Sequence, residues 1–130
     1  MKNQSNIAEF LYDFSADGGA LSTIVLSNKN AKNPMPIGAI VKDVTVRVIT
    51  ACLTATGATM SWGYTGAVTA YSGAAKAAGA LTQDALFEDI SPLYVVNAAS
   101  GDFVIDIAVG SFTAGKAVFE VEYLYPAITL

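Results

Sequence analysis

Residues 117–125, AVFEVEYLY, decide the fold class of this chain. Apolar side chains at Phe119, Val121 and Tyr123 alternate with two glutamates. Because successive side chains of a strand point to opposite faces of a sheet, a period of two predicts a β-strand with one buried side and one solvent-facing side. The segment is therefore expected to be a strand of an antiparallel sheet with one wet face.

The same period of two recurs along most of the chain. Runs of alternating or β-branched residues occupy 10–14, 20–27, 39–54, 58–64, 93–96 and 102–109. Stretches rich in Gly, Pro and Asn separate many of these runs and are typical of turns and loops. About eight strands with little helix predict an all-β domain, an antiparallel β-sandwich with a jelly-roll-like topology.

Local composition predicts several connections and one irregularity. Asp17-Gly18-Gly19 is typical of a tight hairpin turn, because glycine readily adopts the positive φ angles that such turns require. Residues 110–116 are expected to form a second turn, and residues 66–89 an excursion that packs on the sheet. The alternation is lost from Ile49 onward, which predicts a β-bulge near Thr50.

Length and composition limit the possible classes of protein. The chain has 130 residues and a mass of 13.5 kDa, which suits one domain, and we expect a flexible arm at 1–7, a β-sandwich at 8–125 and a tail at 126–130. Hydrophobic residues make up 53% of the chain and charged residues 14%, which excludes an intrinsically disordered chain. A net charge of −4 gives no basic surface for nucleic acid, and no apolar run is long enough for a membrane span.

The sequence offers little for catalysis. It contains no histidine, the commonest general acid–base group, and no glycine-rich phosphate-binding motif. Cys52 stands alone between Ala51 and Leu53, which favours a small buried side chain over a nucleophile. We therefore expect no enzyme activity, no cofactor and no metal.

Two sets of carboxylates leave alternatives open. Glu120 and Glu122 lie on one face of a strand, at a spacing that a hydrolase could use, although almost any pair two residues apart meets it. A solvated outer face is the favoured interpretation. Asp84, Glu88 and Asp89 could offer oxygen ligands to calcium, but they do not follow the spaced pattern of a calcium-binding loop.

Aromatic residues suggest another alternative, a glycan-binding module. Trp62, Tyr64, Tyr71 and Tyr94 could provide rings on which sugars stack. Trp62 and Tyr64 share strand parity with Met60, however, which favours packing in the core. Tyr71 lies in a loop rich in Gly and Ala and is therefore the predicted exposed binding aromatic.

The apolar excess predicts that a partner covers part of the surface. A domain this rich in apolar residues and this poor in charge resembles the subunit of an obligate assembly. The apolar tail after the last strand could dock on a neighbour by adding a strand to an open sheet edge. We expect contacts to the assembly at Asn3, Ile7, Ile128 and Leu130.

Several turns and strand starts carry a resemblance to a known family. These segments are 12–14, 17–20, 22–24, 37–41, 112–116 and 119–123. In these segments, and in its length, the chain resembles the capsid decoration, or cement, proteins of tailed bacteriophages.

The resemblance implies a structural role in the virion. It implies a β-sandwich or jelly-roll subunit that assembles as a homotrimer and binds the major capsid protein on the outer shell, where it stabilises the capsid against the pressure of packaged DNA. The implied location is the exterior of the virion after synthesis in the host cytoplasm. The polar residues 1–6 lack the apolar stretch of a secretory signal, which agrees with that expectation. With this resemblance, the glycan-binding alternative becomes a module of a phage fibre or another head or tail structural protein.

Overall fold

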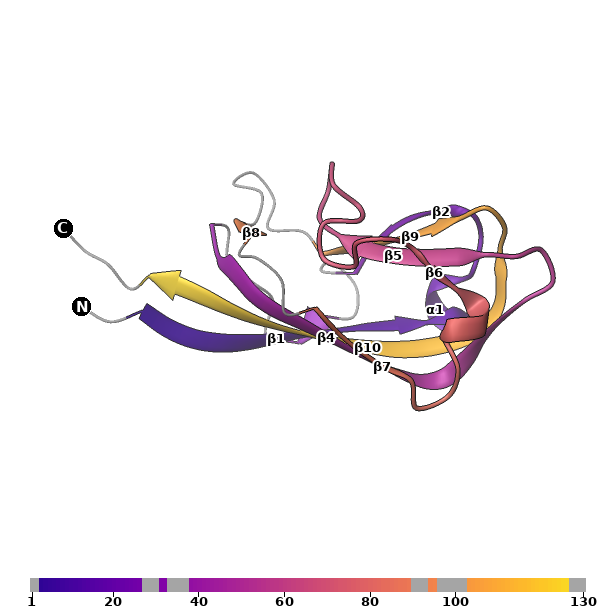
Figure 1. Cartoon of the computed structure of the whole chain (residues 1–130), viewed down its shortest axis with the longest axis horizontal. Coiled ribbons are helices and arrows are strands. Elements are labelled where there is room, and N and C mark those ends of the chain that lie inside the picture. Colours follow the sequence, from indigo (N-terminus) through magenta and orange to yellow (C-terminus); the bar gives the residue numbers. More distant parts are fainter. Residues whose placement is uncertain (1–2, 27–30, 33–37, 90–93, 96–102, 127–130) are drawn as a thin grey trace.

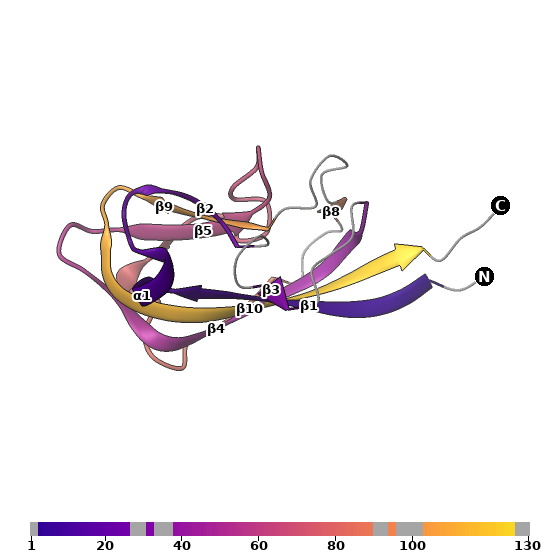
Figure 2. The ribbon, with the colours of Figure 1, turned by 180° about the vertical axis from the view of Figure 1, so that it is seen from behind.

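The computed structural model describes residues 3–26, 31–32, 38–89, 94–95 and 103–126, which form two facing antiparallel β-sheets (Figures 1 and 2). The larger sheet contains β1 (Asn3–Asp13), β3 (Ala31–Lys32), β4 (Ile40–Thr54), β7 (Leu86–Asp89), β8 (Tyr94–Val95) and β10 (Phe112–Pro126). The smaller sheet contains β2 (Ser22–Val25), β5 (Thr59–Gly63), β6 (Lys76–Ala77) and β9 (Val104–Ala108). Helix in the described residues is confined to α1 (Phe14–Asp17) and the short 3-10 helix η1 (Ala78–Ala80).

The strand pairing is nested from the ends of the chain inward. β1 pairs with β10, β2 with β9, β4 with β7 and β5 with β6, and each pair is antiparallel. Successive pairs alternate between the two sheets, as in a long hairpin that has been rolled up, and this arrangement is a jelly roll. The predicted all-β sandwich and its jelly-roll topology are therefore confirmed.

The two longest strands, β4 and β10, form the centre of the larger sheet. Lys116 pairs with Thr50 but the next residue, Ala117, pairs with Val48, so Ile49 is an extra residue in β4. The bulge predicted near Thr50 is confirmed. It lies toward the α1 end of the sheet and bends these long strands locally.

The core lies between the two sheets and is rich in aromatic side chains. Phe10 of the larger sheet stacks on Phe103, with ring centroids 4.7 Å apart. Trp62 of the smaller sheet contacts Phe119 of the larger one edge-on at 5.5 Å. These side chains are 0–1% exposed, and the alternation that predicted Phe119, Val121 and Tyr123 as inward-facing is confirmed.

A short helix closes one end of the larger sheet. The side chain of Asp13 accepts hydrogen bonds from the backbone N–H and hydroxyl of Ser15, each within 3.0 Å, and so caps α1. Asp13 also lies 3.9 Å from the ammonium group of Lys116, its register partner on β10. The amide of Phe112 donates to the carbonyl of Gly19, and a Cβ at Gly19 would collide with the Phe112 backbone.

Two predicted turns do not join paired strands. Asp17-Gly18-Gly19 leads from β1 in one sheet to β2 in the other, so the predicted hairpin there is wrong. Residues 110–116 do not form a turn throughout, because β10 already begins at Phe112 and pairs with Thr54. In both places the chain crosses between the layers, which local composition alone does not distinguish from a hairpin.

The excursion predicted at 66–89 contributes to both sheets. It contains β6, η1 and β7, and β7 pairs with β4 at the edge of the larger sheet. Within the excursion, Lys76 and Ala77 pair with Met60 and Thr59 as β6.

The structure describes residues 3–7 of the arm predicted at 1–7. They continue β1, and Asn3 pairs with Pro126 and Ile7 with Glu122, so their backbone has a regular partner. The paired ends of β1 and β10 extend to one side of the sandwich (Figure 1). In the described part of the chain, helices are too short and insufficiently apolar to span a membrane.

Candidate interaction surface

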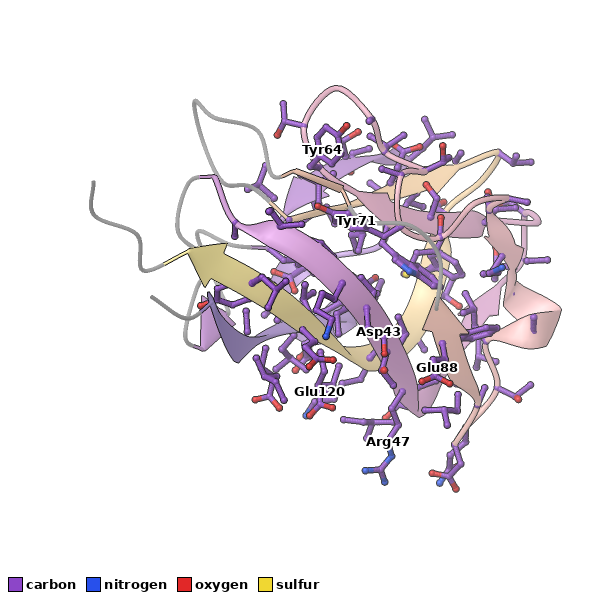
Figure 3. The ribbon with its side chains drawn as sticks, turned by 60° about the vertical axis from the view of Figure 1, so that its left-hand side comes forward. Asp43, Arg47, Tyr64, Tyr71, Glu88 and Glu120 are labelled. Carbon is purple, nitrogen blue, oxygen red and sulfur yellow. The ribbon has the colours of Figure 1, made fainter. Side chains whose placement is uncertain are left out.

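The outer face of the larger sheet, which points away from the smaller sheet, carries a row of carboxylates. Glu9, Glu120, Thr45 and Glu88 lie in direct register across β1, β10, β4 and β7. Thr45 is the one member without a carboxylate. Figure 3 shows Glu120 and Glu88 on the same side of the sheet. We call Glu9, Glu88 and Glu120 the glutamate row.

A neighbouring row on the same face is mostly apolar. Leu11, Val118, Arg47 and Leu86 are aligned in register across the same four strands. Leu86 is 66% exposed, and Leu11 and Val118 are half-buried. The outer face therefore places exposed apolar surface directly beside negative charge.

The glutamate row places like charges opposite each other. Glu9 and Glu120 are direct register partners, and carboxylates in that position destabilise an antiparallel pair. Within the described residues, no ion pair involves the glutamate row, and Arg47 extends away from the sheet (Figure 3). Folding alone does not explain this placement.

The two rows enclose a shallow hollow of about 230 Å³. Its lining is Glu9, Thr45, Arg47, Leu86, Val118 and Glu120. A hollow lined by both apolar side chains and carboxylates suits a side chain that combines an aliphatic stem with a cationic end.

Two of the four predicted contact residues, Asn3 and Ile7, lie on β1. Ile7 is 58% exposed and lies on β1 two residues before Glu9, on the same face. Asn3 pairs in register with Pro126 near the end of β10. Ile128 and Leu130 lie outside the described residues, so their predicted role stays a prediction.

The predicted exposure of Tyr71 is wrong. Its side chain is 0% exposed and its ring stacks on Phe103 with centroids 5.8 Å apart. The Tyr71 backbone N–H donates to the carbonyl of Trp62 at 3.1 Å, and this bond turns the loop back onto the sandwich. A buried ring offers no platform for a sugar. Trp62 is 1% exposed, which confirms the core interpretation for that residue.

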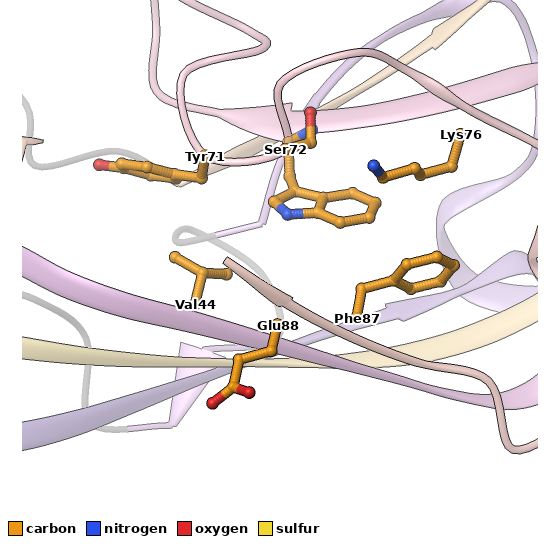
Figure 4. A pocket seen from close by; sticks show the side chains of 7 residues that line it. Val44, Tyr71, Ser72, Lys76, Phe87 and Glu88 are labelled. Atoms are coloured by element: carbon orange, nitrogen blue, oxygen red, sulfur yellow. The ribbon is translucent and has the colours of Figure 1, made fainter. Parts of the chain in front are cut away.

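A small cavity of about 130 Å³ opens at the edge of the sandwich (Figure 4). Its lining includes Trp62, Ser72, Lys76 and Phe87, and the Lys76 ammonium lies 5.7 Å from the Phe87 ring centroid. The indole N–H of Trp62 is buried without a hydrogen-bond acceptor. Glu88 also lines this cavity, and Figure 4 shows its carboxylate turned away from Tyr71 and Lys76.

The remaining candidate catalytic and metal-ligating residues do not form a site within the described part of the chain. Glu120 is exposed on the outer face, with Glu122 half-buried two residues along β10. No group of three potential metal-ligating side chains comes together in the described ranges. Cys52 is 2% exposed, and burial raises the pKa of its thiol to about 11, which keeps it protonated at neutral pH. The small buried side chain predicted there is confirmed.

Sequence reasoning missed the glutamate row. Glu120 was considered for catalysis and Glu88 for calcium, but nothing in the sequence linked either of them to Glu9. Their alignment follows from the register of four strands that are distant in sequence. Charge alternation within 117–125 marked one strand of the row, and the pairing partners supplied the rest.

Comparison with known proteins gives matches at the level of structure. No family model matches the sequence, and no curated protein matches it. A chain of the cyanophage Pam1 capsid asymmetric unit superposes with a TM-score of 0.67 at 20% identity, over 95% of this chain and 86% of that chain. A chain of the acidic stable capsid structure of Helicobacter pylori bacteriophage KHP30 superposes with a TM-score of 0.59 at 17% identity, over 98% of this chain and 97% of that one.

At these identities the likeness establishes the fold. Both alignments run over nearly the whole of this chain, so they include both sheets and not a shared fragment. The resemblance to small capsid-associated proteins of phages, drawn from the sequence, is confirmed as a resemblance of fold. This chain has a jelly-roll fold that is also found among the chains of phage capsids.

Proposed function

We propose that this chain is a structural protein of a phage virion that binds the outer surface of the capsid as a homotrimer and stabilises the shell. The observation that carries the proposal is the likeness of fold to chains of two phage capsids over at least 95% of this sequence. The partners are the major capsid protein and two further copies of the chain. The role is structural and includes no catalytic step.

The chemistry of the described surface supports this role. The outer face of the larger sheet has exposed apolar side chains at Ile7 and Leu86 beside the glutamate row. Such a mixed surface is typical of protein interfaces, and a negative charge keeps the subunit from binding DNA before assembly. A trimer would hold several modest contacts at once, which raises the effective concentration of each contact without a single strong site.

We propose that the subunit contacts its neighbours through the start of β1 and the end of β10. Asn3 and Ile7 lie on β1, and Ile128 and Leu130 are two and four residues after Pro126 in the sequence. Because Asn3 pairs with Pro126, the start of β1 and the end of β10 lie side by side. We propose these four residues as contacts to the capsid or to other copies.

The test is a binding experiment with expanded, undecorated heads of its phage. The purified chain is mixed with these heads, and bound protein is counted after sedimentation, while native mass spectrometry gives the state of the free chain. The proposal expects a trimer, saturable binding in multiples of three, and heads that withstand more heat. A monomer that leaves the heads bare would overturn it.

The contribution of the tail is tested with a shortened chain. Deletion of residues 127–130 removes Ile128 and Leu130 but keeps Pro126, the register partner of Asn3. We expect weaker binding to heads and an unchanged melting temperature. Full binding by the shortened chain would remove the tail from the mechanism.

A further inference from the structure

The glutamate row differs from Asp13 of β1 in having no ion pair within the described residues, although Lys32 of β3 is the register partner of Glu9. Asp13, at the end of β1, has Lys116 at 3.9 Å and two hydrogen bonds from Ser15. In the described residues, Glu9, Glu88 and Glu120 take part in neither a salt bridge nor a side-chain hydrogen bond. Three carboxylates aligned across one sheet face thus stay available to a partner.

The hollow beside the glutamate row provides a concave surface next to these carboxylates. Val118 and Leu86 contribute apolar lining to this hollow, and Glu9 and Glu120 contribute carboxylates. Long cationic side chains pack their methylene stems on apolar surface and keep the charged end in polar surroundings. An arginine additionally presents a planar fork that binds carboxylates in a bidentate manner.

We propose that this outer face is the docking surface for a basic, lysine- or arginine-bearing segment of the capsid shell protein. The inference rests on the proposed function and specifies which surface of the subunit faces the shell and what chemistry it meets there. The stems of the basic side chains cover Val118 and Leu86, and their charged ends meet the glutamate row.

A second copy of the chain suits this surface poorly. Two outer faces brought together would place one glutamate row against another. The described cations do not form a complementary patch. Lys116 pairs with Asp13, Lys76 lies over the Phe87 ring, and Arg47 belongs to the outer face itself. Lys32 borders that face on β3, and Lys42 lies on β4. Nucleic acid is disfavoured because it is anionic.

The experiment compares the triple variant E9Q/E88Q/E120Q with the wild-type chain on expanded, undecorated heads. Glutamine keeps the shape of the side chains and removes their charge. The matched control is D106N on the outer face of the smaller sheet, where Asp106 accepts a hydrogen bond from Thr23 at 2.7 Å that an asparagine oxygen can also accept. Circular dichroism and melting curves check that all three chains are folded.

The expected result is a loss of affinity that depends on salt. At low salt the triple variant should bind heads about tenfold more weakly than wild type, and D106N should stay within about twofold. Added salt should weaken the wild type and leave the triple variant nearly unaffected, because the charges that salt screens are gone. Carbodiimide labelling of bound wild type should show Glu9 and Glu120 protected and Asp106 accessible.

The outcomes separate this inference from the proposed function. If wild-type chain binds heads and the triple variant binds equally well, the docking surface is wrong while the proposed function stands. If wild type fails to bind heads, both are wrong. If the triple variant loses the trimer together with binding, the face belongs to contacts between copies and the inference is overturned.

Discussion

Strands β1 and β10 place Phe10 opposite Phe119 on their inner face and, one residue along, Glu9 opposite Glu120 on their outer face. The inner pair is 0% exposed and contacts the aromatic cluster of the smaller sheet. The outer pair consists of two like charges in direct register, and Lys32 of β3 is the register partner of Glu9 on its other side. Packing on the inner face stabilises the fold, whereas the like-charge pair on the outer face lowers its stability. A surface that lowers folding stability is a candidate binding surface.

The largest effect is expected on the inner face. Replacing Phe119 with Ala removes a ring that contacts both Trp62 and Phe103, and should lower the free energy of unfolding by about 3–5 kcal/mol. Chemical denaturation measures this loss. F119L, which keeps an apolar side chain of intermediate size, should lose clearly less. Equal losses in both variants would mean that the ring contacts are not what stabilises this face.

The outer face of the smaller sheet should behave differently from that of the larger one, because a loop covers part of it. A Cβ at Gly63 would collide with the backbone of Ala67 and Ala70, so G63A should destabilise the fold by about 1–3 kcal/mol. Gly79 is the matched control, since a Cβ there meets nothing within 4 Å and G79A should be nearly neutral. Thermal melting of the two variants compares them. A neutral G63A would show that the loop moves aside.

The sequence predicted which side chains of a strand face the core better than it predicted which strands pair with each other. The inward set at Phe119, Val121 and Tyr123 and the bulge near Thr50 are confirmed, because alternation and its loss are local properties of a strand. The hairpin at Asp17-Gly18-Gly19 was wrong, since a glycine turn looks the same whether the chain returns within a sheet or crosses to the other.

The candidate surface was harder to predict than the fold, because it also depends on which strands pair with each other. The glutamate row depends on the register of four strands, which a single sequence does not encode in any one segment. Tyr71 was predicted to be exposed because its neighbours are small, yet its N–H bonds to Trp62 and its ring stacks on Phe103. Loop composition describes the backbone and says little about where one large ring goes.

Asp13, a carboxylate with hydrogen-bond partners, allows a comparison with the glutamate row, and the expected effect on stability is smaller than those above. Hydrogen bonds from the side chain and backbone of Ser15 hold the pKa of Asp13 below its ordinary value near 3.8. A carboxyl whose pKa is lowered on folding stabilises the protein above its unfolded pKa, and this contribution is lost as the pH falls through the folded pKa. D13N should therefore melt slightly below wild type at neutral pH, and the difference should vanish in acid. Melting curves across pH test this, and a difference that grows in acid would contradict it.

The smallest effect should have the opposite sign. E120Q removes the like-charge contact with Glu9 on the outer face, so the free energy of unfolding should rise by about 0.2–1 kcal/mol at low salt. The gain should fade as salt screens the remaining charge. Urea denaturation at two salt concentrations measures it, with T45S in the same row as the control because it changes no charge. A loss of stability in E120Q would mean that Glu120 already has a stabilising partner, and the outer face would then be an ordinary solvated surface. A gain in stability together with weaker binding to heads would show that this face trades folding stability for contact with a partner.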